Sequence, residues 1–133
     1  MGNRAVITHK EEEWGLYTHS LGDRATVEGF LNYANMMYHE LGPKGQVLYL
    51  QEIMSPCTTG ELKVSRYQRL DRDNGENGVY IINSDWEIIG RKYIRDPIES
   101  EAYNLLEIMK TIDEKQKSPV GEQKIREYLR NRT

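Results

Sequence analysis

Residues 71–94, DRDNGENGVYIINSDWEIIGRKYI, contain two apolar segments between polar turn residues. The segments 78–82 and 86–94 are rich in β-branched and aromatic side chains, which fit a pleated, half-buried surface. Residues 83–85, Asn-Ser-Asp, form a short polar connection of the kind that joins two antiparallel strands. We therefore predict a β-hairpin here, around which the rest of the chain is organised.

The composition is typical of one water-soluble folded domain. The chain has 133 residues, enough for one hydrophobic core and too few for two independent ones. It has 38% hydrophobic and 29% charged residues, a net charge of -3 and a mean hydropathy of -0.75, unlike disordered or membrane chains. No apolar run approaches the roughly 20 residues that cross a bilayer, and residues 1–7 do not resemble a signal peptide. We expect a cytoplasmic protein without membrane contact.

The sequence contains no complete catalytic, metal-binding or nucleotide-binding motif. Cys57 is the single cysteine, which excludes an intramolecular disulfide and a multi-cysteine zinc site, and we expect a partly buried thiol. His9, His19 and His39 share no metal-ligand spacing. The mild acidity argues against broad affinity for nucleic acid. We therefore predict a protein that is not an enzyme and that holds no metal and no cofactor.

The first half of the chain predicts a hairpin followed by a helix. Residues 4–8 and 14–19 have strand patterns and are expected to pair. Asp23 is a suitable helix cap, and Gly42-Pro43 is expected to end the helix, since proline cannot continue it. The apolar stripe of this helix is Val27, Phe30, Leu31, Ala34, Tyr38 and Leu41.

The remaining elements complete the sheet and add helices. Residues 46–54 fit either a helix or a strand, and we favour a helix. Residues 62–67 alternate as a strand that would precede the central hairpin in one antiparallel meander. Residues 99–116 predict a helix that starts at Glu99 or Ser100 and packs on the sheet. Residues 120–130 predict a terminal helix, with Ser118-Pro119 as its cap and first turn.

Together these elements define an α+β fold. We predict an antiparallel sheet of about five strands with two hairpins, and three to four helices packed mainly on one face. Residues 1–117 form a single α+β domain in this interpretation, and residues 118–133 form a short basic C-terminal helical extension. The extension is either a contact surface or a frayed helix.

Residues 71–77 resemble a calcium-binding loop, because oxygen-bearing side chains alternate before a glycine. The glycine, Gly75, stands at the fifth place of the loop, and Ile82 occupies the twelfth place instead of a bidentate acid. An Asn/Asp/Gly turn explains the same composition, since these side chains bond their own backbone and glycine accepts positive φ. We therefore predict a turn here instead of a metal site.

Basic and aromatic residues of two predicted strands form one candidate binding surface. If residues 62–67 adjoin the hairpin, these side chains can bind phosphate, an acidic protein or single-stranded nucleic acid. A solvated sheet face, on which the cations pair with nearby carboxylates, is the alternative. The residues of this surface are Arg66, Trp86, Arg91, Lys92 and Tyr93.

Acidic side chains form a second candidate surface in two loops. Complementary charge speeds and orients docking, so these loops can contact a cationic groove. A solvated loop is the alternative for the three consecutive glutamates, because like charges repel one another. The residues of this surface are Glu11, Glu12, Glu13, Asp71, Asp73 and Glu76.

Tyrosine is used far more than phenylalanine, with nine residues against one. A tyrosine side chain has a rigid apolar body and a polar tip, which suits a surface that is wet when free and buried when bound. We expect a partner interface or a homodimer, with half-exposed core edges as the alternative.

Four segments resemble a known family. They are residues 1–8 (MGNRAVIT), 27–31 (VEGFL), 77–82 (NGVYII) and 86–91 (WEIIGR). Through them, residues 1–116 resemble a family of small proteins of phages, prophages and mobile elements of Gram-positive bacteria. The resemblance brings no enzymatic activity and no catalytic residue to this chain.

The resemblance implies a non-enzymatic anti-defence protein in the cytoplasm of a bacterial host. Its most specific form is an anti-CRISPR inhibitor that binds and occludes a host Cas nuclease, with the acidic loops competing with nucleic-acid phosphates. One alternative is a sponge for a nucleotide immune signal, with Arg66 and Arg91 on phosphate and Trp86 or a tyrosine on the base. Another is a small nucleic-acid-binding regulatory protein, whose affinity falls steeply with ionic strength.

Overall fold

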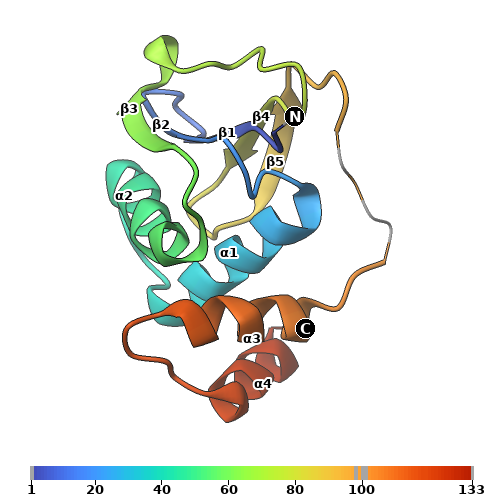
Figure 1. Ribbon diagram of the computed structural model, residues 1–133. Helices are drawn as coiled ribbons and strands as arrows, with labels where there is room; N and C mark the ends of the chain where they lie inside the picture. The colour runs from blue at the N-terminus through green and yellow to red at the C-terminus, as the bar shows by residue number, and fades with distance from the viewer. Residues whose placement is uncertain (1, 98, 100–101, 133) are drawn as a thin grey trace.

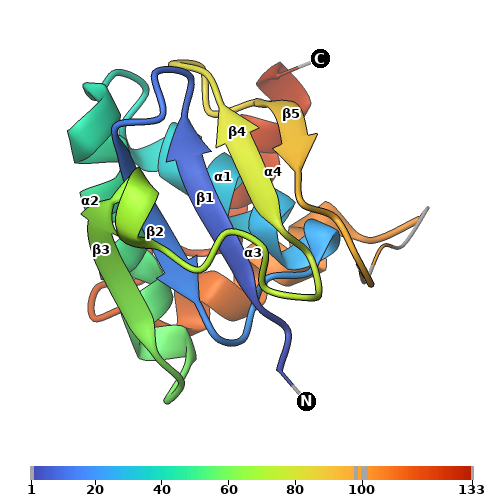
Figure 2. The same ribbon diagram turned by 90° about the horizontal axis from the view of Figure 1, so that it is seen from above.

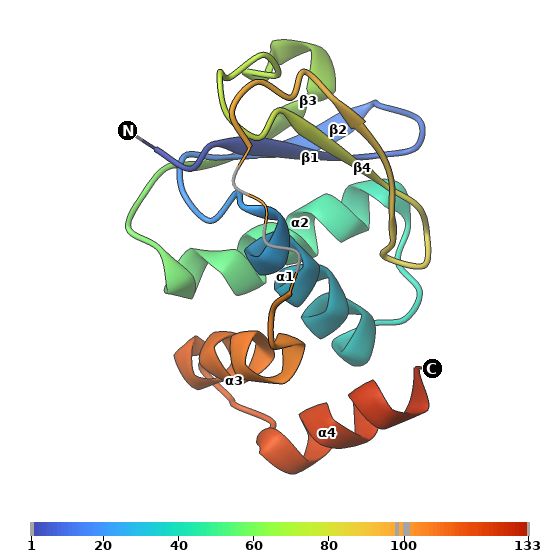
Figure 3. The same cartoon turned by 90° about the vertical axis from the view of Figure 1, so that its right-hand side faces the viewer.

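The protein is built in three layers: a β-sheet, a pair of helices against one face of it, and a second pair of helices behind the first (Figure 1 and Figure 3). The computed structural model describes residues 2–97, 99 and 102–132. The strands are β1 (Ala5–His9), β2 (Trp14–Thr18), β3 (Leu62–Arg66), β4 (Val79–Ile82) and β5 (Ile88–Lys92). The helices are α1 (Arg24–Met37), α2 (Pro43–Met54), α3 (Leu105–Lys115) and α4 (Glu122–Asn131), with 3-10 turns at Ser55–Cys57 and Tyr67–Arg69. The predicted α+β class is confirmed.

The sheet is mixed and has the strand order β3-β2-β1-β4-β5 (Figure 2). Both predicted hairpins are confirmed, since β1 pairs antiparallel with β2 and β4 pairs antiparallel with β5. The prediction of an antiparallel sheet is wrong at the centre, where β1 and β4 run parallel with Val6 opposite Val79.

The predicted meander of β3 into the second hairpin is also wrong. Strand β3 pairs with β2, at the edge of the sheet away from β5. Residues 67–78 then cross the face of the sheet opposite the helices (Figure 3). There Tyr67 and Leu70 pack on Val6 and Val79. This second, smaller apolar cluster holds the crossing segment and brings β4 beside β1.

Helix α1 begins where the sequence predicts and ends earlier. The Asp23 carboxylate accepts a hydrogen bond from the Thr26 backbone N–H (3.1 Å) and caps the first turn. The helix ends just before Tyr38, whose backbone is extended and whose side chain is 50% exposed. Gly42 and Pro43 do not end α1 as predicted. They are the cap and the first residue of α2. Proline suits this position because a backbone N–H in the first turn has no partner within the helix.

Helix α2 includes residues 46–54, so the helical interpretation of that segment is confirmed. Val47, Leu50 and Met54 are fully buried in the main core, which lies between the sheet and the helices. Among the helices described, none combines the length and the apolar character needed to cross a membrane.

Helix α3 begins later than predicted, at the cap residue Asn104. Its side chain accepts a hydrogen bond from the Glu107 backbone N–H (3.2 Å). The predicted start at Glu99 is wrong, since Glu99 lies outside the helix, and the alternative start at Ser100 lies outside the described residues. Helix α3 packs on α1 and not on the sheet, because α1 and α2 already cover that face (Figure 3). The two helices are so close that a Cβ on Gly29 would collide with Ile108.

The predicted C-terminal helix is present as α4, and its Ile125 is fully buried in the main core. The predicted start at Ser118-Pro119 is wrong, since Gly121 (φ +93°) is the cap. Asp113 of α3 explains the later start. Its carboxylate accepts hydrogen bonds from the backbone N–H groups of Val120 (2.9 Å) and Gly121 (3.0 Å), which fixes the chain just before the helix.

Candidate functional site

The β4–β5 turn is a rigid polar corner at one end of the sheet. Asn83 organises it, because Oδ1 of its side chain accepts from the backbone N–H groups of Asp85 (2.9 Å) and Glu87 (3.0 Å). Trp86 has a left-handed backbone (φ +63°) and a buried ring, and its indole N–H donates to the Tyr38 carbonyl (2.9 Å). The turn is therefore fixed to the end of α1, while the Asp85 and Glu87 side chains are exposed.

A polar cavity of about 360 Å³ lies between this turn, α1 and the end of α4. The Tyr128 hydroxyl bridges two amides at the cavity: it donates to Asn32 Oδ1 (2.8 Å) and accepts from Asn35 Nδ2 (3.1 Å). These bonds fix the amide groups before any ligand arrives. The charged residues of the lining are Glu28, Asp85, Glu87 and Arg132.

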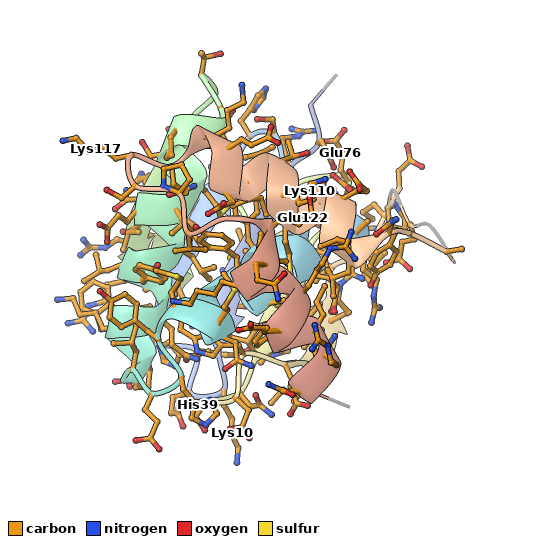
Figure 4. All side chains as sticks on the ribbon, turned by 90° about the horizontal axis from the view of Figure 1, so that it is seen from below. Lys10, His39, Glu76, Lys110, Lys117 and Glu122 are labelled. Carbon is orange, nitrogen blue, oxygen red and sulfur yellow. The ribbon has the colours of Figure 1, made fainter. Side chains whose placement is uncertain are left out.

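Two further hollows continue the first one around the turn. The second, of about 410 Å³, shares His39 and Asp85 with the first, and the third, of about 300 Å³, shares Leu41 and Ser84 with the second. The third reaches the β1–β2 loop at Lys10, and Figure 4 shows His39 and Lys10 at the same end of the molecule. We call the three hollows together the acidic groove. Its five carboxylates, Glu11, Glu28, Glu40, Asp85 and Glu87, outnumber its cations, Lys10 and Arg132.

At the β1–β2 loop, the wall of the acidic groove is supported by a buried histidine. His9 is 1% exposed, and its Nε2 accepts a hydrogen bond from the Trp14 backbone N–H (3.0 Å). We therefore assign the ring proton to Nδ1, which donates to Glu11 Oε1 (3.1 Å) and leaves the Glu11 backbone N–H, 3.3 Å from the same nitrogen, as a longer contact. This bond from His9 and a backbone hydrogen bond lower the pKa of Glu11. Glu11 thus presents a negative charge to the groove at neutral pH.

Three of the six acidic residues predicted to bind a partner are ion-paired within the molecule. Burial alone would raise the pKa of Glu76, but hydrogen bonds from the Arg4 side chain and backbone hold it below its usual value. The hydrogen bond from Arg95 likewise lowers the pKa of Asp73. The three pairs are Glu12–Lys92 (2.7 Å), Asp73–Arg95 (3.0 Å) and Glu76–Arg4 (2.8 Å).

The six predicted acidic residues do not form one surface. Glu11 lines the acidic groove. Glu13 and Asp71 use their backbone carbonyls structurally, accepting from the Tyr67 N–H (3.0 Å) and from Asn74 Nδ2 (3.1 Å). The predicted surface is therefore divided between the acidic groove and the face of the sheet that residues 67–78 cross.

The predicted turn at residues 71–77 is confirmed. Oδ1 of the buried Asn74 accepts from the backbone N–H groups of Glu76 (3.2 Å) and Gly78 (3.0 Å), and both Gly75 and Gly78 have positive φ. In the part of the chain that the structure describes, no group of three or more histidine, cysteine, aspartate or glutamate side chains is placed to hold a metal ion.

The structure does not bring the predicted basic residues together. Arg66 and Arg91 belong to β3 and β5, which are the two edge strands on opposite sides of the sheet. Arg66 lies over the Trp14 ring, 4.2 Å from its centroid, and Lys44 lies 4.1 Å from the same ring. Arg91 lies 3.9 Å from the centroid of the Tyr80 ring. The two arginines therefore cannot bind one phosphate group.

The other three predicted residues are also dispersed. Trp86 is 3% exposed and belongs to the main core. Lys92 is paired with Glu12 on the face of the sheet that carries the crossing segment. Tyr93 has a left-handed backbone and is 44% exposed. Trp86 is therefore too buried to stack on a nucleotide base without a rearrangement of the turn.

Sequence reasoning missed most of the acidic groove. Glu28, Asn32, Asn35 and His39 follow one another at spacings of four, three and four residues, which places the first three on one face of α1. This polar stripe is a signal that the sequence contained. The contribution of Arg132 depends on how α4 packs against α1 and could not be read from the sequence.

No family model matches the chain, and neither a curated protein nor a solved structure matches it. The resemblance to phage and mobile-element proteins therefore stays a prediction. The protein belongs to the class of α+β folds with a mixed β-sheet, and an acidic groove runs around its β4–β5 turn.

Proposed function

We propose that this chain is a non-enzymatic binding protein that docks a basic segment of a partner protein in the acidic groove. The observation that supports this function is the excess of five carboxylates over two cations in a depression shaped by a rigid turn. A fixed acidic surface attracts lysine-rich and arginine-rich surfaces and accelerates their association. The same groove favours binding over catalysis, because the polar side chains of Asn32, Asn35 and Tyr128 are hydrogen-bonded to one another.

In particular, we propose an anti-defence role in a bacterial cell, as an inhibitor that binds and occludes a Cas nuclease. The nucleic-acid channel of such a nuclease is positively charged, which is the chemistry that the acidic groove complements. The sequence resemblance of residues 1–116 to phage and mobile-element proteins supports the same role. The groove residues would then take the place of nucleic-acid phosphates.

The proposal is tested by phage plating on a panel of Gram-positive hosts, each carrying one CRISPR–Cas system and a spacer against the phage. Expression of the wild-type chain should restore plaques in at least one host. The Glu40→Lys/Asp85→Lys variant should bind the nuclease at least about a hundredfold more weakly and fail to restore them, since close charge pairs across an interface couple by about 1.5 kcal/mol or more each. Both side chains are exposed, so the fold should tolerate the change.

The matched control is Glu61→Lys/Glu114→Lys, which changes the net charge equally at two exposed positions outside the groove. This control variant should restore plaques as the wild type does. If the wild type restores plaques in no host, the anti-CRISPR role is wrong. If the groove variant Glu40→Lys/Asp85→Lys and the control variant Glu61→Lys/Glu114→Lys inhibit the nuclease equally, the acidic groove is not the binding site.

A further inference from the structure

A cavity of different chemistry lies between the end of α1, helix α2 and the α3–α4 connection. Its volume is about 250 Å³, far above the roughly 10–15 Å³ that a single water molecule needs. It shares no lining residue with the acidic groove. The lining residues that matter here are Tyr33, Met37, Tyr38, Tyr49, Glu52 and Lys117.

Two tyrosine rings form a corner of this cavity. The rings of Tyr38 and Tyr49 are 4.7 Å apart between centroids and are inclined at 83°. Trp86 supports Tyr49 from behind, with its ring 6.5 Å away and inclined at 71°. The Tyr38 backbone is fixed by two hydrogen bonds, from its N–H to the Ala34 carbonyl (2.7 Å) and from the Trp86 indole to its own carbonyl (2.9 Å). The corner is therefore held in place although Tyr38 is half-exposed.

The charges around the corner favour a cation. Burial, followed by Tyr38 and Glu52, raises the pKa of Tyr49 to about 12, so its ring is a neutral phenol at physiological pH. Glu52 lies three residues after Tyr49 on α2 and therefore on the same side of the helix. Lys117 is the cation of the lining, and Figure 4 shows its side chain pointing away from the molecule. Neutral rings and a carboxylate thus face the cavity.

We propose that this cavity binds a quaternary ammonium group, with the faces of Tyr38 and Tyr49 against the cation and Glu52 as its counter-charge. Ammonium groups are attracted to the faces of aromatic rings, and a methylated ammonium fits a box of aromatic side chains because its surface is weakly hydrated. Met37 and the buried ring of Tyr33 supply the apolar floor for the methyl groups. This binding does not depend on the function proposed for the acidic groove.

The first experiment compares choline with its neutral isostere 3,3-dimethyl-1-butanol by NMR titration of the labelled protein. Choline should bind with a dissociation constant on the order of 1 mM, with shifts at the amides of the cavity. The neutral alcohol should bind at least about tenfold more weakly, because only the cation gains from the ring faces and from Glu52. Equal binding of the two compounds would overturn the proposal.

Variants then locate the site. Tyr38→Leu and Glu52→Gln should each weaken choline binding at least about fivefold, whereas Lys117→Gln should strengthen it by removing a like charge. Tyr103→Leu is the control, since Tyr103 is also a partly exposed tyrosine (38%) but does not line the cavity. Unchanged affinity in both Tyr38→Leu and Glu52→Gln would place the binding elsewhere and contradict the assignment.

The source of the ammonium group is decided with a peptide that contains trimethyllysine. Tighter binding of the peptide than of choline would identify a methylated protein as the source, and equal binding would identify a free small molecule. The Glu40→Lys/Asp85→Lys variant should bind choline as the wild type does, which separates this site from the acidic groove. Loss of choline binding in that variant would contradict an independent site.

Discussion

At the scale of the residue, His9 shows how one buried side chain sets the shape of a loop. Its Nε2 satisfies the Trp14 backbone N–H, and its Nδ1–H holds the Glu11 carboxylate. Replacing His9 with alanine leaves that N–H without an acceptor and opens a cavity. We expect His9→Ala to lower the free energy of unfolding by about 2–4 kcal/mol. The measurement is urea denaturation followed by circular dichroism.

His39→Ala is the matched control for this prediction. His39 is exposed and follows the end of α1, where its Nδ1 contacts the Asn35 side chain (3.0 Å), so the change should stay within about 0.5 kcal/mol of the wild type. Nitrogen-15 NMR of the imidazole rings checks the tautomer directly. A proton found on Nε2 of His9 would contradict the hydrogen-bond assignment.

At the scale of the element, helix α4 depends on its contacts and not on its own propensity. It has 10 residues, whereas isolated helices shorter than about 12–15 residues are marginal in water. The fully buried Ile125 and the Asp113 carboxylate, which also accepts from the Tyr33 hydroxyl (2.7 Å), attach it to α1 and α3. These contacts make α4 a part of the folded core.

We expect Ile125→Ala to destabilise the protein by about 2–4 kcal/mol, because the buried side chain leaves a cavity between three helices. Lys124→Ala, at the exposed neighbouring position, is the control and should change the stability by less than about 0.5 kcal/mol. Urea denaturation gives both values, and hydrogen exchange should show the α4 amides opening first in Ile125→Ala. Equal stability of the two variants would mean that α4 is not docked through Ile125.

At the scale of the whole molecule, local patterns predicted the elements, and contacts distant in sequence decided their arrangement. The hairpins and the Asp23 cap have short-range causes and were predictable. The parallel pairing of β1 with β4 was not, because it depends on Tyr67 and Leu70 covering the far face of the sheet. The prediction that residues 99–116 pack on the sheet was wrong for the same reason, because α1, where Gly29 leaves room for Ile108, covers α3 instead.

The same distinction explains the candidate sites. Charge runs in the sequence suggested acidic and basic surfaces, but ion pairs between residues far apart in the sequence neutralise much of that charge. The acidic groove arises where α1, the β4–β5 turn and α4 meet, so its composition follows from packing. Three of the nine tyrosines line the cavity proposed for a quaternary ammonium group, and the partner interface or homodimer that the tyrosine surplus suggests stays a prediction.

Two buried tyrosines, Tyr33 and Tyr80, and the partly buried Tyr49 also predict how the whole molecule responds to alkali. Burial and the Asp113 hydrogen bond raise the pKa of Tyr33, burial raises that of Tyr80 against the opposing effect of Arg91, and the pKa of Tyr49 is about 12. In the unfolded chain these groups ionise near the ordinary value of about 10. Their contribution to stability is therefore complete below about pH 10 and is lost as the pH rises through the folded-state pKa values, by about 1.4 kcal/mol per pH unit for each tyrosine.

Urea midpoints measured from pH 8 to 12, together with the absorbance of the phenolate, test this pH dependence. The slope should be smaller in Tyr80→Phe, whereas a flat profile in the wild type would contradict the raised pKa values of all three tyrosines.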